Sequence, residues 1–242
     1  MNGQVQPPLR STQHWATPHG LWSYDCWGHH GRPVVFIPAV MFDRLMWWPA
    51  AADLRPHATV IAPDLPGHGA STRRTHYDPD EIVAELAGLV DHLGVRRAPV
   101  VVGHASAAAL AERFAATYAT QAVVTVDPVS TSADPLATAE PDDYLSAMQL
   151  DAIPPQYREL VRPAADTSLL AAYAPCRSAM ELPPSTRAAT CTRLVVRSRP
   201  PGKPLAPAST GNLHRQVIYE VTGRFPHLAD VDRFVRDLRA LL

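Results

Sequence analysis

Five consecutive residues, Gly103-His104-Ala105-Ser106-Ala107, constrain the fold more than any other part of the chain. An apolar segment runs into them and an alanine-rich segment leaves them, so the sequence predicts a strand, a sharp turn and a helix. This is the context of a G-x-S-x-G nucleophile elbow, in which the turn lifts the central side chain toward a substrate. Here the central residue is Ala105, and its methyl group cannot react.

The neighbouring serine does not restore a nucleophile. A register centred on Ser106 would put His104 two residues before the nucleophile, where the turn needs a very small residue. A register centred on Ala105 puts Gly103 and Ala107 at the crowded flanks instead. Ala105 therefore occupies the nucleophile position, and we expect Ser106 to cap the following helix.

Composition excludes several classes of protein. A chain of 242 residues, 46% hydrophobic and 19% charged, can form one α/β domain or a domain with a small insertion. Its net charge of -1 gives no electrostatic basis for binding nucleic acid or an anionic membrane. No segment approaches the roughly 20 apolar residues that a membrane helix needs.

Cysteine usage points to a reducing compartment. Cys26, Cys176 and Cys191 are odd in number and widely spaced, which predicts buried free thiols and neither a disulfide framework nor a zinc site. We therefore expect a cytoplasmic protein, a monomer or homodimer, that binds a small molecule and uses no metal or cofactor.

Strand and helix patterns alternate along the chain, which favours a mainly parallel sheet with helices on both faces. Residues 12–27 predict a hairpin that turns at Pro18-His19-Gly20. The other predicted strands are 33–37, 59–62, 99–102, 123–126, 194–196 and 217–219, and the predicted helices are 78–93, 106–117 and 230–242. The proline-interrupted stretch 129–190 predicts a small helical cap, with residues 1–128 and 191–242 as the core, and 199–211 is a loop.

Five segments carry a resemblance to a known family. They are Thr17-Pro18-His19-Gly20, the strand Val34-Val35-Phe36-Ile37-Pro38-Ala39, the turn Asp64-Leu65-Pro66-Gly67-His68-Gly69, the elbow, and Gly223-Arg224-Phe225-Pro226-His227-Leu228. In this order and spacing, the chain resembles an α/β-hydrolase-fold protein over nearly its whole length. The resemblance implies an eight-stranded, mainly parallel sheet with a small cap. Fold alone does not establish function, which must be argued from the site.

The site departs from the family pattern at its chemical positions. The nucleophile is missing at Ala105, and the last motif places Arg224 where the family has its catalytic His and His227 where it has a structural one. An arginine cannot serve as a general base near neutral pH, because its pKa stays above about 12. The chain therefore resembles a degenerate member that has lost both the nucleophile and the catalytic His.

The acid position is partly retained. No carboxylate follows the segment 194–196, but Asp127 ends the segment 123–126 and fits the alternative acid position of the family. Two interpretations stay open for Asp127: this acid position, or a strand-end carboxylate that accepts backbone hydrogen bonds in the turn. If Asp127 holds the acid position, we expect it to form a charge-assisted pair with Arg224.

Other residues are candidates for ligand contact. Pro38-Ala39 replaces the His-Gly pair common in the family's oxyanion loop, although the backbone N–H groups of Val40 and Ser106 could still act as donors. We expect His104 to be packed and hydrogen-bonded, and Trp47 to belong to the core. The residues expected to line an apolar pocket under the cap are Val40, Met41, Trp48, Tyr144 and Met148.

Three functions fit this pattern. The first is a non-hydrolytic enzyme that promotes a cyclisation, elimination or isomerisation of a small, largely apolar molecule by orientation and polar contacts. The second is a serine hydrolase whose nucleophile has been replaced by engineering, which explains Ala105 but not Arg224. The third is a ligand-binding or regulatory protein that kept the fold and lost catalysis. We favour the first.

Overall fold

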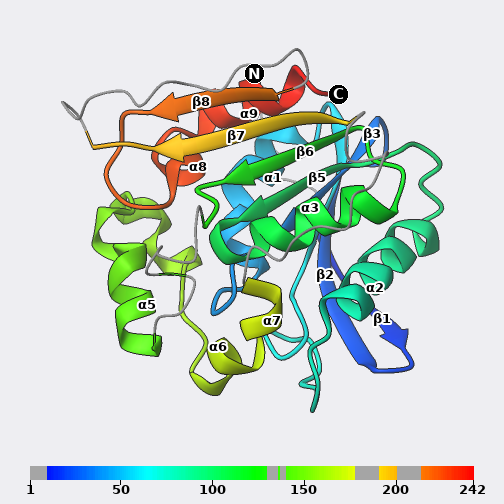
Figure 1. The fold of residues 1–242 in the computed structure, drawn as a ribbon. Coiled ribbons are helices and arrows are strands. Elements are labelled where there is room, and N and C mark those ends of the chain that lie inside the picture. The colour runs from blue at the N-terminus through cyan, green and yellow to red at the C-terminus, as the bar shows by residue number, and fades with distance from the viewer. Residues whose placement is uncertain (1–9, 130–135, 137–139, 178–190, 201–213) are drawn as a thin grey trace, which may run out of the picture.

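The computed structural model describes residues 10–129, 136, 140–177, 191–200 and 214–242. In these residues eight strands form one sheet in the order β1-β2-β4-β3-β5-β6-β7-β8 (Figure 1). Strand β2 pairs antiparallel with β1 and β4, and all other neighbours are parallel. The bounds are β1 Arg10–Thr17, β2 Gly20–Trp27, β3 Arg32–Ile37, β4 Ala58–Pro63, β5 Val100–His104, β6 Ala122–Val126, β7 Thr192–Ser198 and β8 His214–Tyr219. The predicted fold class is confirmed.

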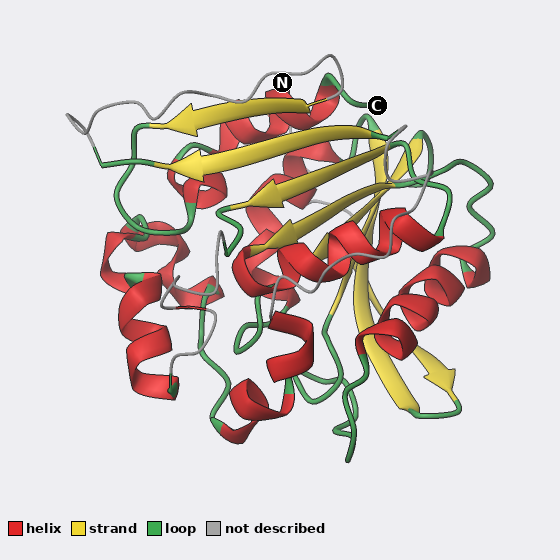
Figure 2. Ribbon diagram, viewed as in Figure 1, coloured by secondary structure: helices red, strands yellow, loops and turns green. Residues whose placement is uncertain are grey.

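Helices cover both faces of the sheet, because the central parallel strands are apolar and buried on both sides (Figures 1 and 2). Helices α2 (Pro79–His92) and α3 (Ala108–Thr117) pack together on one face. Helices α1 (Trp48–Leu54), α8 (Pro226–Ala229) and α9 (Val231–Arg239) pack together on the other. The carboxylate of Asp78 caps α2 by accepting from the N–H groups of Asp80 and Glu81, which agrees with the predicted start of this helix.

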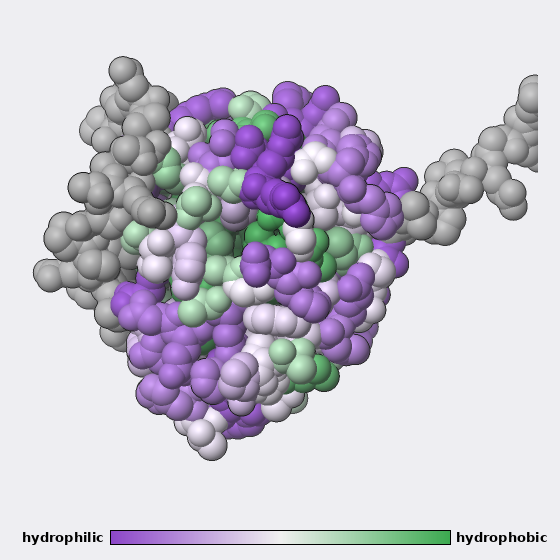
Figure 3. All heavy atoms as spheres, turned by 90° about the vertical axis from the view of Figure 1, so that its right-hand side faces the viewer, coloured by the Kyte–Doolittle hydropathy of each residue, from purple (hydrophilic) through white to green (hydrophobic). Residues whose placement is uncertain are grey.

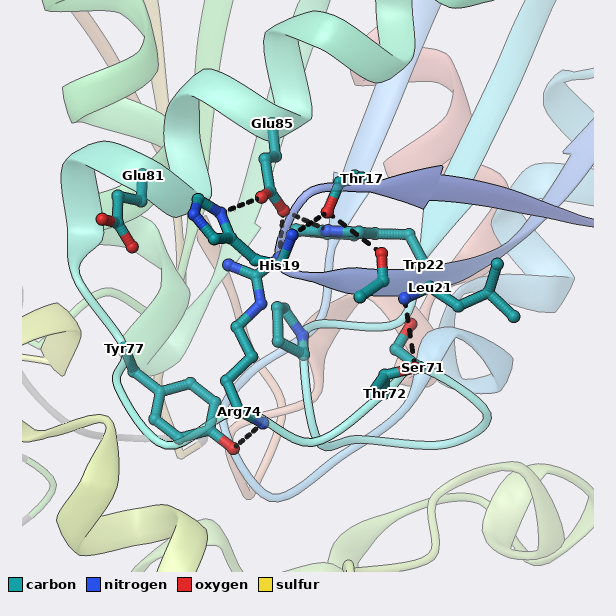
Figure 4. Close-up of polar contacts among 12 residues, drawn as sticks. Thr17, His19, Leu21, Trp22, Ser71, Thr72, Arg74, Tyr77, Glu81 and Glu85 are labelled. Atoms are coloured by element: carbon teal, nitrogen blue, oxygen red, sulfur yellow. Dashed lines mark hydrogen bonds and ion pairs between the residues drawn. The ribbon is translucent and has the colours of Figure 1, made fainter.

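The buried carboxylate of Glu85 links the turn of the β1–β2 hairpin to helix α2 by hydrogen bonds. Glu85 of α2 accepts hydrogen bonds from the indole N–H of Trp22 and from Arg74, and its Oε1 lies 2.7 Å from Nδ1 of His19. Figure 4 shows the three side chains converging on the carboxylate. Burial opposes ionisation of Glu85, but these donors outweigh it, so the pKa of Glu85 lies below its ordinary value.

Short helices lie beyond the carboxyl ends of the strands, between β6 and β7 (Figure 1). They are α5 (Pro141–Met148), the 3-10 turns Leu150–Ala152 and Pro155–Leu160, α6 (Ser168–Ala172) and α7 (Ala174–Arg177). Hydrogen bonds join them to the loops after β3 and β4, among them Ala164 N–H to the Met41 carbonyl at 2.7 Å and Tyr173 hydroxyl to the Pro66 carbonyl at 2.8 Å. The division into a core and a cap at 129–190 stays a prediction.

Two predicted helices differ at their ends. The helix predicted over 106–117 begins at Ala108, after a 3-10 turn over Ala105–Ala107, because the sharp turn out of β5 uses those residues. The last helix spans Val231–Arg239 and therefore ends before residue 242. Most of the predicted loop 199–211 lies outside the described residues. None of the helices in the described segments is long and apolar enough to cross a membrane.

Candidate functional site at the elbow

The elbow has the geometry that the sequence predicts. Ala105 follows β5 directly, is 1% exposed and has a φ of 45°, a left-handed conformation that non-glycine residues adopt at a cost of about 1–2 kcal/mol. A Cβ on Gly103 would lie 2.5 Å from the carbonyl oxygen of Ala107, so the flanking position accepts only glycine. These two features support the register with Ala105 at the nucleophile position.

Ser106 is not the helix cap that the sequence predicts. The residue that caps α3 is Ala107, which makes no side-chain cap, and the Ser106 hydroxyl turns away to other partners. Its Oγ accepts the backbone N–H of Val40 at 3.0 Å and lies 2.9 Å from the hydroxyl of Tyr144. The 3-10 turn explains the difference, because it places Ser106 before the α-helix proper and directs its side chain to the loop after β3.

A hydrogen-bond network joins the elbow, the loop after β3 and α5. The Tyr144 hydroxyl donates to the Val40 carbonyl at 3.1 Å. A tyrosine hydroxyl has one proton, so the Ser106 hydroxyl must be the donor in its contact with Tyr144. Each polar group of Val40 thus has a partner, and the predicted oxyanion donor at its N–H is bonded within the protein.

Replacing Tyr144 tests this network. In Tyr144→Phe the Ser106 proton loses its acceptor and the Val40 carbonyl loses its donor, all inside a fully buried site. We expect a loss of about 1–3 kcal/mol in the free energy of unfolding, measured by urea denaturation. Tyr157→Phe, at a half-buried tyrosine in the same segment, is the control and should change stability by less than about 0.5 kcal/mol. Equal effects in both variants would contradict the network.

His68 holds the loop after β3 through a hydrogen bond to Met41. Its Nδ1 donates to the Pro66 carbonyl at 3.2 Å, which leaves Nε2 to accept the Met41 N–H at 3.0 Å. Burial lowers the pKa of His68 to about 4, so the ring is neutral and this pattern of one donor and one acceptor persists at neutral pH. Met41 itself is fully buried with a φ of 77°. The loop that carries Val40 and Met41 is therefore held at both residues.

His104 anchors the segment that carries Arg224. Its Nε2 donates to the Arg224 carbonyl at 2.6 Å, and its ring packs against Trp47, Phe225 and His227. Burial lowers the pKa of His104 to about 4. The imidazole is therefore neutral, and its one N–H is used by the backbone, so His104 is packed and hydrogen-bonded as the sequence indicates.

Asp127 accepts two hydrogen bonds from Ser198. Its Oδ1 accepts the backbone N–H of Ser198 at 2.8 Å and its Oδ2 accepts the Ser198 hydroxyl at 2.5 Å. The charge-assisted pair with Arg224 stays a prediction. Burial raises the pKa of Asp127, and the Ser198 hydrogen bonds and the charge of Arg224 limit the rise. The sequence missed Ser198, although its place at the end of β7, beside β6, was a usable signal.

The remaining predicted ligand contacts divide into two groups. Met148 follows Tyr144 by one turn on the same face of α5, and both side chains are fully buried. Trp48, at the start of α1, is half-buried, and the guanidinium of Arg10 lies 4.7 Å from the centre of its ring. The structure therefore brings Val40, Met41, Ala105, Ser106, Tyr144 and Met148 to one region, and places Trp48 with Arg10.

The sequence analysis also missed a buried ion cluster next to the loop after β3, formed by Asp25, Arg44 and Asp64. Nε of Arg44 lies 3.1 Å from Oδ1 of Asp25, and its NH1 pairs with Oδ2 of Asp64. Asp64 also accepts the backbone N–H groups of Arg44 and Ala70, each at 2.9 Å. Burial raises the pKa of Asp64 to about 6, although these partners oppose the rise. The cluster holds the segment that follows Val40 and Met41.

No group of three or more His, Cys, Asp or Glu side chains within the described ranges is arranged to hold a metal ion. The three cysteines are free thiols. Among the described residues at the elbow, the groups next to Ala105 include the hydroxyls of Ser106 and Tyr144, backbone amides and the neutral imidazole of His104.

Comparisons with known proteins agree with this geometry. Epoxide hydrolase A of Mycobacterium tuberculosis (strain ATCC 25618 / H37Rv) is 39% identical over 84 residues, which are 32% of this chain and only a quarter (25%) of that protein. Among solved structures, E-2-(acetamidomethylene)succinate hydrolase matches with a TM-score of 0.74 and 18% identity, covering 96% of this chain and 99% of the other. A thermophilic esterase from Thermogutta terrifontis matches with a TM-score of 0.71 and 21% identity, covering 96% and 97%.

A family model matches more than half of the chain. The model describes the alpha/beta hydrolase fold and matches residues 32–174, a range that begins at β3 and includes the elbow and the helices up to α7. Together with the sheet order and the register of the elbow, this match establishes that the chain belongs to the α/β hydrolase-fold family.

Proposed function

We propose that this chain binds a small, largely apolar molecule at the elbow and promotes a step without a covalent intermediate, such as a cyclisation, an elimination or an isomerisation. The observation that carries the proposal is the side chain of Ala105, a buried methyl group on the residue where this fold presents its nucleophile. Covalent catalysis needs a hydroxyl, thiol or carboxylate at that position. The chain has none there, so catalysis must use orientation and polar contacts.

Apolar walls and two hydroxyls support binding at this place. Val40, Met41 and Met148 are fully buried next to the elbow, and the only hydroxyls in this group are those of Ser106 and Tyr144. A ligand carbonyl could take the Tyr144 proton in place of the Val40 carbonyl, which would polarise the ligand at a fixed position. Orientation of this kind can contribute several kcal/mol to a rate.

Introducing a serine tests the absence of hydrolysis. We expect the chain as written, Ala105→Ser and Ala105→Ser with Arg224→His all to leave p-nitrophenyl butyrate, a γ-lactone and styrene oxide unhydrolysed above the blank rate. The reason is that the Ser106 hydroxyl already accepts the Val40 N–H, so a new serine would lack one of the two backbone oxyanion donors. Ala109→Ser, a half-buried position in α3, controls for the added hydroxyl.

Two outcomes would contradict the proposal. Hydrolysis by the chain as written would show that another residue supplies the nucleophile. Hydrolysis that appears only in Ala105→Ser, at a rate at least 100-fold above the Ala109→Ser control, would favour a serine hydrolase inactivated at one position.

The hydrogen-bond network at the elbow also favours a second candidate, a ligand-binding or regulatory protein. The Val40 N–H, the Val40 carbonyl and both hydroxyls are bonded to one another, which is a stable resting arrangement for a site that binds without chemistry. The two candidates separate on the fate of the ligand. Mass spectrometry of small molecules that copurify with the protein, before and after incubation, should show conversion for an enzyme and an unchanged ligand for a receptor.

A further inference from the structure

The loops at the amino-terminal ends of the parallel strands form a basic edge. Three loops, residues 28–31 before β3, 55–57 before β4 and 93–99 before β5, contain no aspartate or glutamate. With histidines counted as neutral, three arginines and no carboxylate give these loops a net charge of +3, against -1 for the whole chain. The nearest carboxylates in sequence, Asp53 and Asp91, belong to the helices that lead into two of the loops. The basic residues of the loops are Arg55, Arg96, Arg97, His29, His30 and His57.

A cavity of about 440 Å³ opens at this edge. Cys26, Leu93 and Val95 supply apolar, half-buried walls, and the exposed side chains of Arg96 and Arg97 also line it. No carboxylate is among the lining residues, all of which the structure describes. Figure 3, which faces this end of the molecule, shows a hollow in which apolar side chains are bordered by hydrophilic ones.

Two histidines, His29 and His30, line the cavity, and hydrogen bonds hold the second of them. Nε2 of His30 lies 3.1 Å from the Pro56 carbonyl, and the His30 carbonyl accepts the Thr59 hydroxyl at 3.2 Å, so this loop is tied to the start of β4. His29 is exposed and lines the cavity beside it. Hydrogen bonds therefore hold the backbone of this loop, while the side chains of His29, Arg96 and Arg97 line the cavity and are exposed to solvent.

We propose that this cavity binds a small amphiphilic anion, an aromatic ring or short apolar chain that carries one phosphate or carboxylate group. The apolar walls fit the body of such a ligand, and the guanidinium groups of Arg96 and Arg97, which both line the cavity, match the oxygens of a phosphate or carboxylate. The volume lies within the range of small-molecule pockets, about 300–1,000 Å³. A neutral ligand would form no ion pair with Arg96 or Arg97, and an anion without an apolar part would leave the apolar walls exposed to water.

This site is separate from the elbow. Residues 95–97 precede β5 and line the cavity, whereas Ala105 follows the same strand at its other end. Five strand residues separate the two, a rise of roughly 16 Å. The inference does not rest on the function proposed for the elbow.

Protection of Cys26 provides a local measurement. Cys26 lines the cavity and is half-buried, while Cys176 and Cys191 are buried elsewhere and serve as internal references. Burial raises the pKa of the Cys26 thiol, so the full chain is alkylated with neutral iodoacetamide at about pH 8.5 and analysed by mass spectrometry. We expect 2-naphthyl phosphate or 2-naphthoate to slow alkylation of Cys26 at least 5-fold with saturable dependence on concentration. Inorganic phosphate and 2-naphthol at the same concentrations should slow it less than 2-fold.

Charge variants then assign the binding to the two arginines. In the double variant Arg96→Gln with Arg97→Gln, the probe concentration that gives half protection should rise at least 10-fold. Both side chains are exposed, so the substitutions should not affect the fold. Arg236→Gln, an exposed arginine of α9, is the matched control and should bind as the unchanged chain does.

Several results would overturn the proposal. These are the absence of saturable protection by both anionic probes, equal protection by 2-naphthol or inorganic phosphate, and an equal loss of affinity in Arg236→Gln. Circular dichroism of the double variant tests whether it is folded, so that a loss of protection in a folded variant reports binding alone.

Discussion

Arg44→Met should lower the free energy of unfolding by about 3–5 kcal/mol, because it leaves two buried carboxylates without their shared cation. The side chains of Asp25 and Asp64 are fully buried, and Arg44 contacts both. Arg10 gives only partial compensation, since its Nε lies 3.5 Å from Asp25 and its side chain is 29% exposed. Urea denaturation at pH 7 measures the loss.

A matched control separates burial from charge. Arg162→Met removes an ion pair with Glu159 in which the side chains are 71% and 79% exposed, so its effect should stay within about 0.5 kcal/mol. A loss in Arg44→Met no larger than that of the control would show that Arg44 does not hold the cluster. Because loss of Arg44 raises the pKa of Asp64 still further, the deficit of Arg44→Met should also be smaller at pH 5 than at pH 7.

Stability should fall by at least about 2 kcal/mol between pH 7 and pH 5. Burial lowers the pKa of His68 and of His104 to about 4, from 6.5 in the unfolded chain. Below pH 6.5 the unfolded chain therefore binds protons that the folded chain excludes, and stability is lost as the pH falls from 6.5 toward 4. Each of the two contributes a loss of about 1.8 kcal/mol by pH 5.

Two other groups change the size of this effect. Burial holds the pKa of His227 well below its ordinary value, which acts in the same direction. The raised pKa of Asp64, about 6 against 3.8, acts in the opposite direction, because the folded chain binds this proton first. Asp64 therefore contributes about 1.3 kcal/mol of added stability between pH 7 and pH 5, which leaves the histidines dominant.

His227→Leu identifies one source of the pH dependence. Neither ring nitrogen of His227 has a hydrogen-bond partner among the described residues, and the ring packs against Trp47 and Phe234. The variant should therefore lose less stability than the unchanged chain between pH 7 and pH 5. His29→Gln, at an exposed histidine, should keep the original dependence, and a slope unchanged in His227→Leu would contradict the assignment.

Local sequence patterns predicted the backbone of the site well. The requirement for glycine at 103 followed from the crowding of the turn, and the structure places the Ala107 carbonyl where that Cβ would lie. The exit helix was predicted two residues too early because the 3-10 turn has the same composition as the helix. That error also produced the wrong cap assignment for Ser106.

Side-chain partners were predicted poorly, because they depend on register between distant segments. Asp127 and Ser198 are 71 residues apart and meet only because β6 and β7 pair in one register. Ser106 and Tyr144 are 38 residues apart and meet only where α5 docks.

The sequence by itself determined the order of strands and helices and the place of Ala105 in the sharp turn after β5. These follow from periodicity and from the steric needs of one turn, which are local. Only the tertiary structure decided where the protons of Ser106 and Tyr144 go, which carboxylates share Arg44, and what Asp127 accepts. Those contacts join segments that are far apart in the chain, and a hydrogen bond forms only where the folded backbone brings donor and acceptor within about 3 Å.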